Sequence, residues 1–347
     1  MSKTVLPDPR RSPRFAGLVT FGRYPRLQDV APISSPVDWA IYGVAFDGGV
    51  TYRPGARFGP RAIRDESQYL KRYSLEHGID LCETLSLADA GDAPVAPYSC
   101  ERNAKVVAEF AAKLRGGGKP AETRLLALGG DHSIAYANIR ATWERQGKPR
   151  DGLALVHFDS HLDTVDAVWG EEWGHASVFR RAIKDGLVDP AAMISIGIKG
   201  PLNSRDDLRF ARDNGVTLVP FTDFAERGRP AIAKFLSASR DRPTYISFDI
   251  DCVDPAFAPG TGTPSVGGFT SAEALVAVRL FAGANVVGAD VVEVLPDRDP
   301  QGITALLAAH IAFEILCLDA ASRPVTRSRP PDPKRPSPRA PRGAKRG

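Results

Sequence analysis

The chain has 347 residues, of which 43% are hydrophobic and 25% are charged, proportions that exclude a disordered or fibrous protein. Residues 322–347 contribute +8 to the net charge of +4, which leaves −4 on the rest, so the main body of the chain is mildly acidic. The four cysteines are scattered and form no CxxC pair. We therefore exclude a disulfide framework and expect reduced thiols in a cytoplasmic protein.

The two ends of the chain, residues 1–15 and 322–347, are rich in Pro, Arg and Ser, and we predict both as disordered. The basic tail could touch nucleic acid, but we favour a solvated extension because no aromatic residues interleave its charges. Residues 16–321 show no internal repeat and no linker, which indicates one folded domain. No apolar run reaches the length of a membrane span and the first residues do not resemble a signal peptide, so we expect no membrane partner.

Short apolar runs alternate with helical patterns along this domain. Seven runs are typical of strands buried on both faces: Ala40–Phe46, Leu125–Leu128, Leu153–Phe158, Met193–Ile198, Val216–Val219, Tyr245–Ile250 and Val286–Val294. Amphipathic spacing predicts helices over residues 101–114, 271–282 and 303–318. The alternation predicts an α/β fold in three layers, with a central, mostly parallel β-sheet flanked by helices on both sides.

Polar residues cluster where three of these runs end, which is the edge at which open α/β sheets bind ligands. The segments are Gly129–Ser133 (GGDHS), His157–Thr164 (HFDSHLDT) and Ser247–Cys252 (SFDIDC). On its own, the first could be a tight turn and the third a helix cap. The second is more specific, because alternate side chains of an extended chain share a face, so that Asp159, His161 and Asp163 converge.

Together the segments offer six side chains that can bind a metal ion: His132, Asp159, His161, Asp163, Asp249 and Asp251. Four carboxylates packed together repel one another, and burying them without partners costs free energy. Two divalent ions with a bridging hydroxide would balance their charge. Ligation rich in oxygen with some imidazole favours Mn²⁺ over zinc, and Ni²⁺ or Co²⁺ would also fit.

On these residues the sequence resembles the ureohydrolase (arginase/agmatinase) family, most closely its agmatinase-like branch. The likeness covers residues 15–320 and includes RPGARFGPR at 53–61, the block SFDIDCVDPAFAPGTGTP at 247–264, DVVEV at 290–294 and ITAL at 303–306. The resemblance implies an arginase-like fold over the domain 16–321. It also implies that one ion is held by His132, Asp159, Asp163 and Asp249, and the other by Asp159, His161, Asp249 and Asp251. His157 would be a hydrogen-bonded core residue and not a ligand.

The resemblance also implies a catalytic set of Glu293, His175 and Asp251. Glu293 lies in an otherwise apolar run, where a lone carboxylate needs a partner, and a substrate guanidinium is favoured over an internal salt bridge. His175 falls where the family carries a histidine that shuttles protons to the leaving amine. The hydroxide that bridges the metal ions would attack the guanidinium carbon, and an agmatine-like substrate would yield urea and an amine.

The loop of residues 165–174 (VDAVWGEEWG) brings further charges and aromatic rings close to this site. Glu171 and Glu172 could bind a cationic tail such as that of agmatine, whereas Trp169 and Trp173 could enclose a small or methylated guanidine. Packing of the tryptophans against a neighbouring subunit is an equal alternative. Agmatine is narrowly the leading substrate, ahead of guanidinobutyrate and of guanidine or biguanide-type compounds.

A non-catalytic partner subunit is an alternative to an enzyme, but the complete set of ligand residues argues against it. The resemblance implies a homotrimer or homohexamer, with a paralogous second subunit as a further option. The expected partner of the site is a small guanidino substrate, and we do not expect nucleic acid to bind.

Overall fold

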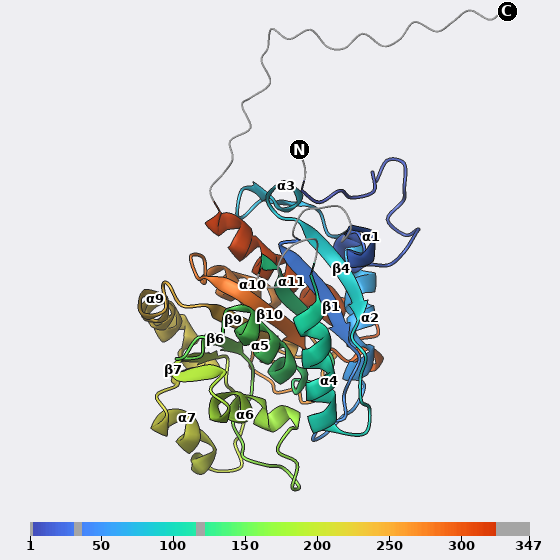
Figure 1. Ribbon diagram of the computed structural model, residues 1–347. Helices are drawn as coiled ribbons and strands as arrows, with labels where there is room; N and C mark the ends of the chain where they lie inside the picture. The colour runs from blue at the N-terminus through green and yellow to red at the C-terminus, as the bar shows by residue number, and fades with distance from the viewer. Residues whose placement is uncertain (1–2, 31–36, 116–121, 324–347) are drawn as a thin grey trace, which may run out of the picture.

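Eight parallel strands form the central sheet of the protein, whose computed structural model describes residues 3–30, 37–115 and 122–323 (Figure 1). In spatial order they are β4 (Leu87–Asp92), β1 (Trp39–Val44), β5 (Arg124–Gly129), β10 (Val286–Val292), β9 (Thr244–Asp249), β6 (Leu153–Phe158), β7 (Val188–Ile196) and β8 (Thr217–Val219). Every pairing between neighbours in this sheet is parallel. A short antiparallel pair, β2 (Tyr73–Ser74) and β3 (Ile79–Asp80), lies outside it.

All seven predicted strands are present in the central sheet, of which the prediction missed β4; the short strands β2 and β3 outside it were not predicted either. Strand β4 lies at the edge of the sheet and has the sequence LADAGD, whose last residues are exposed or half-buried. An edge strand needs apolar side chains only where it faces the core, so it gives no continuous hydrophobic run.

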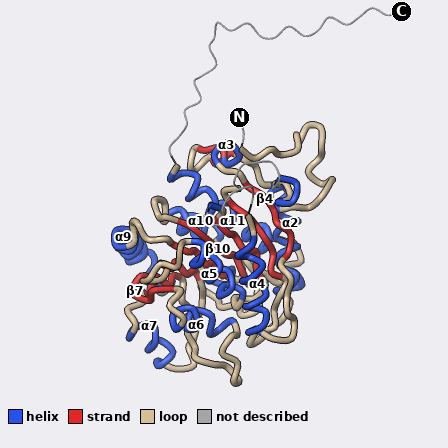
Figure 2. Tube along the Cα trace, in the orientation of Figure 1, coloured by secondary structure: helices blue, strands red, loops and turns tan. Residues whose placement is uncertain are grey.

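The helices cover both faces of the sheet and complete the three predicted layers (Figures 1 and 2). They are α1 (Leu27–Val30), α2 (Gly59–Glu66), α3 (Leu81–Thr84), α4 (Cys100–Lys113), α5 (Ile134–Arg145), α6 (Val178–Lys184), α7 (Arg209–Asp213), α8 (Phe221–Asp223), α9 (Arg229–Ala238), α10 (Ser271–Arg279) and α11 (Ile303–Ser322). Helices α2, α9, α10 and α11 share one hydrophobic core with the sheet, whereas α4, α5 and α6 pack into two others. The α/β class and the layer arrangement predicted from the sequence are confirmed.

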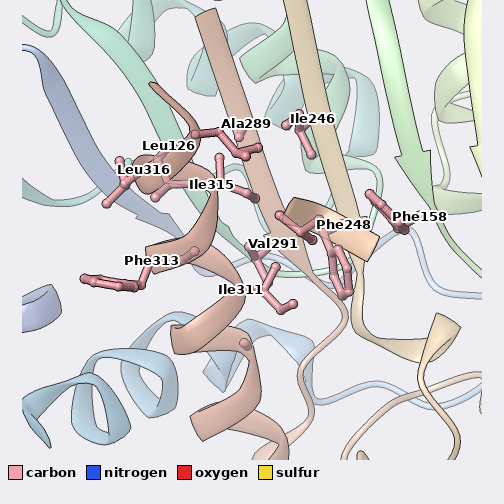
Figure 3. Packing of buried hydrophobic residues seen from close by; sticks show 14 of the residues in the cluster. Leu126, Phe158, Ile246, Phe248, Ala289, Val291, Ile311, Phe313, Ile315 and Leu316 are labelled. Carbon is pink, nitrogen blue, oxygen red and sulfur yellow. The ribbon is translucent and has the colours of Figure 1, made fainter. Parts of the chain in front are cut away.

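Helix α11 is four residues longer than predicted and is the central helix of its layer. By length and composition it could cross a membrane, but 83% of its apolar window is buried inside the protein. Ile311 and Ile315 point toward Val291 and Ala289 of β10 (Figure 3). A helix that is apolar around its whole circumference and buried in this way is a core helix.

Two residues near the N-terminus, within the segment 1–15 predicted to be disordered, form hydrogen bonds with the folded domain. Thr4 is buried, its hydroxyl donates to the carbonyl of Leu85, and its amide donates to Cys82. Arg14 donates to the carbonyls of Gln68 and Leu70. Polar groups of Thr4 and Arg14 make these hydrogen bonds, and no apolar pattern in the sequence indicates them. The tail predicted as disordered lies outside the described residues from position 324 onward.

Candidate metal centre

Four neighbouring strands, β5, β10, β9 and β6, end at the same edge of the sheet, and polar side chains follow each of them. The segments that follow are 130–133 after β5, 159–164 after β6, 250–252 after β9 and 293–295 after β10. Because parallel strands direct their carboxyl ends to one edge, segments that are far apart in the sequence meet here.

The turn after β5 can be made only by glycine. A Cβ on Gly130 would lie 2.1 Å from the carbonyl oxygen of Phe46 and 2.7 Å from that of Val44. The Gly130 amide donates to Val44 at 3.0 Å, so the turn packs directly on the chain that follows β1. This close approach fixes the position of His132, two residues further on.

Three carboxylate oxygens surround Nδ1 of His132. The Oδ2 atom of Asp163 lies at 3.0 Å, that of Asp159 at 3.1 Å and that of Asp249 at 3.2 Å. All four side chains are buried. The geometry therefore offers four ligand atoms around one point.

A second cluster shares Asp159 with the first. Nδ1 of His161 lies 3.0 Å from Oδ2 of Asp251 and 3.2 Å from Oδ1 of Asp159. The two oxygens of Asp159 thus face different clusters, which is the geometry expected of a bridging carboxylate. His161 is 40% exposed, so this second cluster lies on the solvent side of the first. The structure brings all six predicted ligands together.

A count of hydrogen-bond donors shows that the first cluster suits a cation. The Ser247 hydroxyl donates its only proton to Oδ1 of Asp290 at 2.6 Å. Nε2 of His132 lies 2.8 Å from the same hydroxyl oxygen and must therefore be the donor of that contact. A neutral His132 then has no proton on Nδ1, and this atom has no hydrogen-bond partner although three carboxylate oxygens face it. A lone pair among carboxylate oxygens needs a positive ion between them.

The charges of the carboxylates support the same conclusion. In the described part of the chain, histidines are the only basic side chains in ion-pair contact with Asp159, Asp163, Asp249 and Asp251. Burial, and then repulsion from Asp251 and Asp159, raise the pKa of Asp249 well above its usual value, and burial also raises the pKa of Asp251. Divalent cations would remove this cost, so the residues present fit a metal centre.

His157 also lies against the first cluster, but both of its ring nitrogens are engaged. Nδ1 lies 3.1 Å from Oγ of Ser195 and Nε2 lies 2.9 Å from Oδ2 of Asp159. The ring is fully buried. His157 is thus a hydrogen-bonded core residue, as predicted, and it orients the carboxylate of Asp159.

Glu293 lies directly after β10 in an uncommon backbone conformation, with φ of 64°. Its Oε1 accepts from the amide of His132 at 2.8 Å and contacts Nδ1 of His175 at 2.9 Å. Its Oε2 is buried and has no hydrogen-bond partner. The side chain is therefore held by one oxygen and leaves the other free to accept.

Of the four predicted site residues in the loop of residues 165–174, two line a cavity and two contact other side chains of the domain. Trp169 is at the tip of a tight turn between Val168 and Glu171, and its side chain is 85% exposed. Glu171 shares a cavity of about 170 Å³ with Trp169 and with the segment Gly48–Thr51, next to His175. Both residues line this cavity, and their contact with a substrate stays a prediction.

Glu172 and Trp173 have partners elsewhere in the chain. Glu172 forms an ion pair with Arg181 at 2.5 Å. The Trp173 ring packs edge-on against Tyr136 and lies under the guanidinium of Arg181. The charge of Glu172 is thus paired within the chain and the Trp173 ring has two internal neighbours, so substrate contacts of these two residues stay a prediction.

Sequence reasoning missed Asp131, Thr51 and the pair Ser247–Asp290. Asp131 is buried and accepts from the amide of Gly49 at 2.7 Å, and Thr51 contacts His175 through two atoms. Asp131, Ser247 and Asp290 lie in or beside the recognised motifs, and their spacing could have suggested a supporting role. Thr51 lies two residues before the RPGARFGPR motif, but nothing in that motif indicates a contact with His175.

A family model described as the arginase family matches residues 37–318 of the sequence. The chain belongs to the arginase family. Guanidinopropionase of Pseudomonas aeruginosa is 41% identical over 317 residues, which are 91% of this chain and 96% of that protein. The mitochondrial agmatinase of Gallus gallus is 40% identical over 283 residues, 81% of each chain.

A solved structure shows the same arginase-family fold. The proclavaminate amidinohydrolase of Streptomyces clavuligerus matches with a TM-score of 0.81 at 39% identity, over 90% of this chain and 100% of that one. The predicted family and the predicted enzyme class are thus confirmed. Arginase-family enzymes depend on a binuclear metal centre, and the buried His/Asp clusters described above suit one.

Proposed function

We propose that this arginase-family enzyme hydrolyses a linear guanidino compound to urea and an amine. The observation that supports this most directly is Oε2 of Glu293, a buried carboxylate oxygen without a partner beside two clusters that suit metal ions. A guanidinium is planar, is positively charged and presents paired N–H donors, so it complements such an oxygen.

We assign the residues of the site the following roles in this reaction. Glu293 would bind the guanidinium through Oε2, while His132 and His175 hold its other oxygen. When bound, the two cations would lower the pKa of water and so supply hydroxide at neutral pH. His175 would give a proton to the departing amine. Asp251, which accepts from the amide of Ser160 at 2.9 Å, would be held in place by that contact.

The metal ligands that we propose are the six residues of the two clusters. One ion would bind His132, Asp159, Asp163 and Asp249, and the other would bind Asp159, His161, Asp249 and Asp251. We propose Mn²⁺ as the native ion, because oxygen donors outnumber imidazoles, with Ni²⁺ and Co²⁺ as alternatives.

For the substrate we propose an agmatine-like compound with a cationic tail. Glu171 supports this choice, because it lies in the cavity beside His175 and forms no ion pair within the described residues. The alternative is a guanidino acid, which is favoured by the guanidinopropionase and the guanidinobutyrase, 41% and 35% identical to this chain. Trp169 would close over the tail or pack on a neighbouring subunit of a homotrimer or homohexamer.

The test is a urea-release assay on protein loaded separately with Mn²⁺, Ni²⁺ or Co²⁺. Agmatine, 3-guanidinopropionate, 4-guanidinobutyrate, guanidine and a biguanide would each be offered, and the amine product would be measured as well. We expect His161→Ala to abolish turnover, whereas His310→Ala, which changes an exposed histidine of α11, should leave it unchanged. Protein that holds two metal ions per chain and releases no urea from any of these compounds would contradict the proposal.

A further inference from the structure

Both nitrogens of the His175 ring have partners, and the kinds of partner define where its proton lies. Nε2 lies 3.0 Å from the backbone nitrogen of Thr51 and 2.8 Å from its hydroxyl oxygen. A backbone N–H can only donate, so Nε2 must accept and carries no proton. The proton of a neutral ring is then on Nδ1, which lies 2.9 Å from Oε1 of Glu293 and can donate to it.

The Thr51 hydroxyl must also donate to Nε2. If Nε2 carries no proton, a contact of 2.8 Å between two lone pairs would be repulsive, whereas an O–H directed at the ring nitrogen gives a hydrogen bond. Two donors from one residue thus converge on the lone pair of the imidazole. Together they stabilise the neutral ring relative to the imidazolium.

The chain just before Thr51 is held in place by hydrogen bonds of Gly49. The amide of Gly49 donates to the buried Asp131 at 2.7 Å, and the carbonyl of Gly49 accepts from the amide of His175 at 3.1 Å. A Cβ on Gly174 would lie 3.1 Å from the same carbonyl oxygen, so the two chains are in close contact. The segment that positions Thr51 against His175 is therefore held by contacts on both sides of Gly49.

We propose that Thr51 is a positioning residue that holds His175 as the neutral tautomer with its proton on Nδ1. The proton that faces Glu293 and the guanidinium site is then always the Nδ1 proton. The nitrogen that can take up a proton from solvent is Nε2, on the side of Thr51. The role of this proton in catalysis rests on the proposed function, but the tautomer itself does not.

The carboxylates around the His175 ring raise its pKa, whereas the two donors of Thr51 favour the neutral ring and so lower it. Burial lowers the pKa of His175, whereas the hydrogen bond and charge of Glu293 and the charges of Asp163 and Asp131 raise it, to about 9 in all. Asp163 belongs to the metal cluster, and a bound cation would neutralise its effect on the ring. Protonation of Nε2 would also bring its N–H against the amide proton of Thr51, which the geometry opposes.

The experiment follows the ring nitrogens of His175 by NMR. The full-length protein, labelled with ¹⁵N in histidine and loaded with diamagnetic Zn²⁺, would be titrated with acid, and His175→Gln would assign the signal. We expect the ring to be the Nδ1–H tautomer in its neutral form, at pH values above its pKa. Thr51→Val removes one donor to Nε2 and should raise the pKa of His175 by about half to one unit, because one neutral hydrogen bond is lost.

Two variants control for a merely structural effect. Thr51→Ser keeps the hydroxyl and should restore the pKa, and Thr217→Val, at an exposed position of β8, should leave it unchanged. A ring with its proton on Nε2, or a Thr51→Val variant whose His175 pKa falls or does not move, would overturn the proposal. If the tautomer is as expected but the wild-type protein releases no urea, the proposed function fails and the assignment to Thr51 stands.

Discussion

Replacing Asp290 by Asn should weaken metal binding at a site that Asp290 does not touch. Asp290 is fully buried and accepts from Ser247 at 2.6 Å and from Tyr245 at 2.5 Å. In Asp290→Asn the amide is a poorer acceptor, so the Ser247 hydroxyl can turn its proton toward Nε2 of His132. The proton of His132 would then move to Nδ1, the nitrogen that faces the carboxylates.

The size of this effect follows from the position of Asp290 behind a ligand. Loss of such a supporting partner typically lowers metal affinity about 10–100-fold, which corresponds to about 1.4–2.7 kcal/mol. The affinity would be measured by competition with a chromophoric chelator, and the melting temperature of the metal-free variant would report on its fold.

Tyr245→Phe is the matched control for this prediction. It removes the other donor to Asp290 and leaves the contact of Ser247 intact, so we expect a loss of stability of about 1–3 kcal/mol and near wild-type metal affinity. Wild-type affinity in a correctly folded Asp290→Asn protein would refute the reasoning. So would an equal loss of affinity in Tyr245→Phe.

Three further changes test other parts of the site. Glu293→Gln should lower kcat/KM for urea release about 10–100-fold, because a charge-assisted hydrogen bond to the guanidinium becomes a neutral one; an unchanged kcat/KM would exclude this role. Gly130→Ala should destabilise the protein by more than about 3 kcal/mol, since its Cβ would lie 2.1 Å from a carbonyl oxygen, and a thermal melt close to wild type would contradict this. Chelation should make stability depend on pH, because the raised pKa values of Asp249 and Asp251 mean that folding favours their protonated forms. The melting temperature of metal-free protein should therefore fall as the pH rises from the ordinary carboxyl pKa of about 4 toward these raised values. The metal-loaded protein should lack this fall, and equal pH profiles for the two forms would argue against the centre.

The sequence predicted the layers of the fold because its buried strands are continuous apolar runs. Residues 153–158 and 244–249 are buried on both faces, and such strands can be recognised without knowledge of their neighbours. Edge strand β4 and the contacts of Thr4 gave no such signal. Both depend on which surfaces the rest of the fold leaves exposed, and this information is not local.

In the candidate site, too, some contacts could be predicted from local sequence and others depend on the rest of the fold. Asp159, His161 and Asp163 could be placed together because alternate residues share a face at a strand end. The contact of Thr51 with His175 joins segments 124 residues apart. The pairing of Glu172 with Arg181 was equally invisible, because the path of the loop decides whether an acid meets a substrate or a neighbouring arginine.

Helix α11 lies between the candidate metal centre and the last described residues of the chain. It begins at Ile303, shortly after the catalytic edge, and its 20 residues span about 30 Å. At its far end Arg323 donates a hydrogen bond to Asp38, just before β1 begins, so the described chain ends at the edge of the sheet opposite the candidate metal centre. We therefore expect that a surface linkage made at Arg323 would hold the protein with the candidate metal centre facing away from the surface.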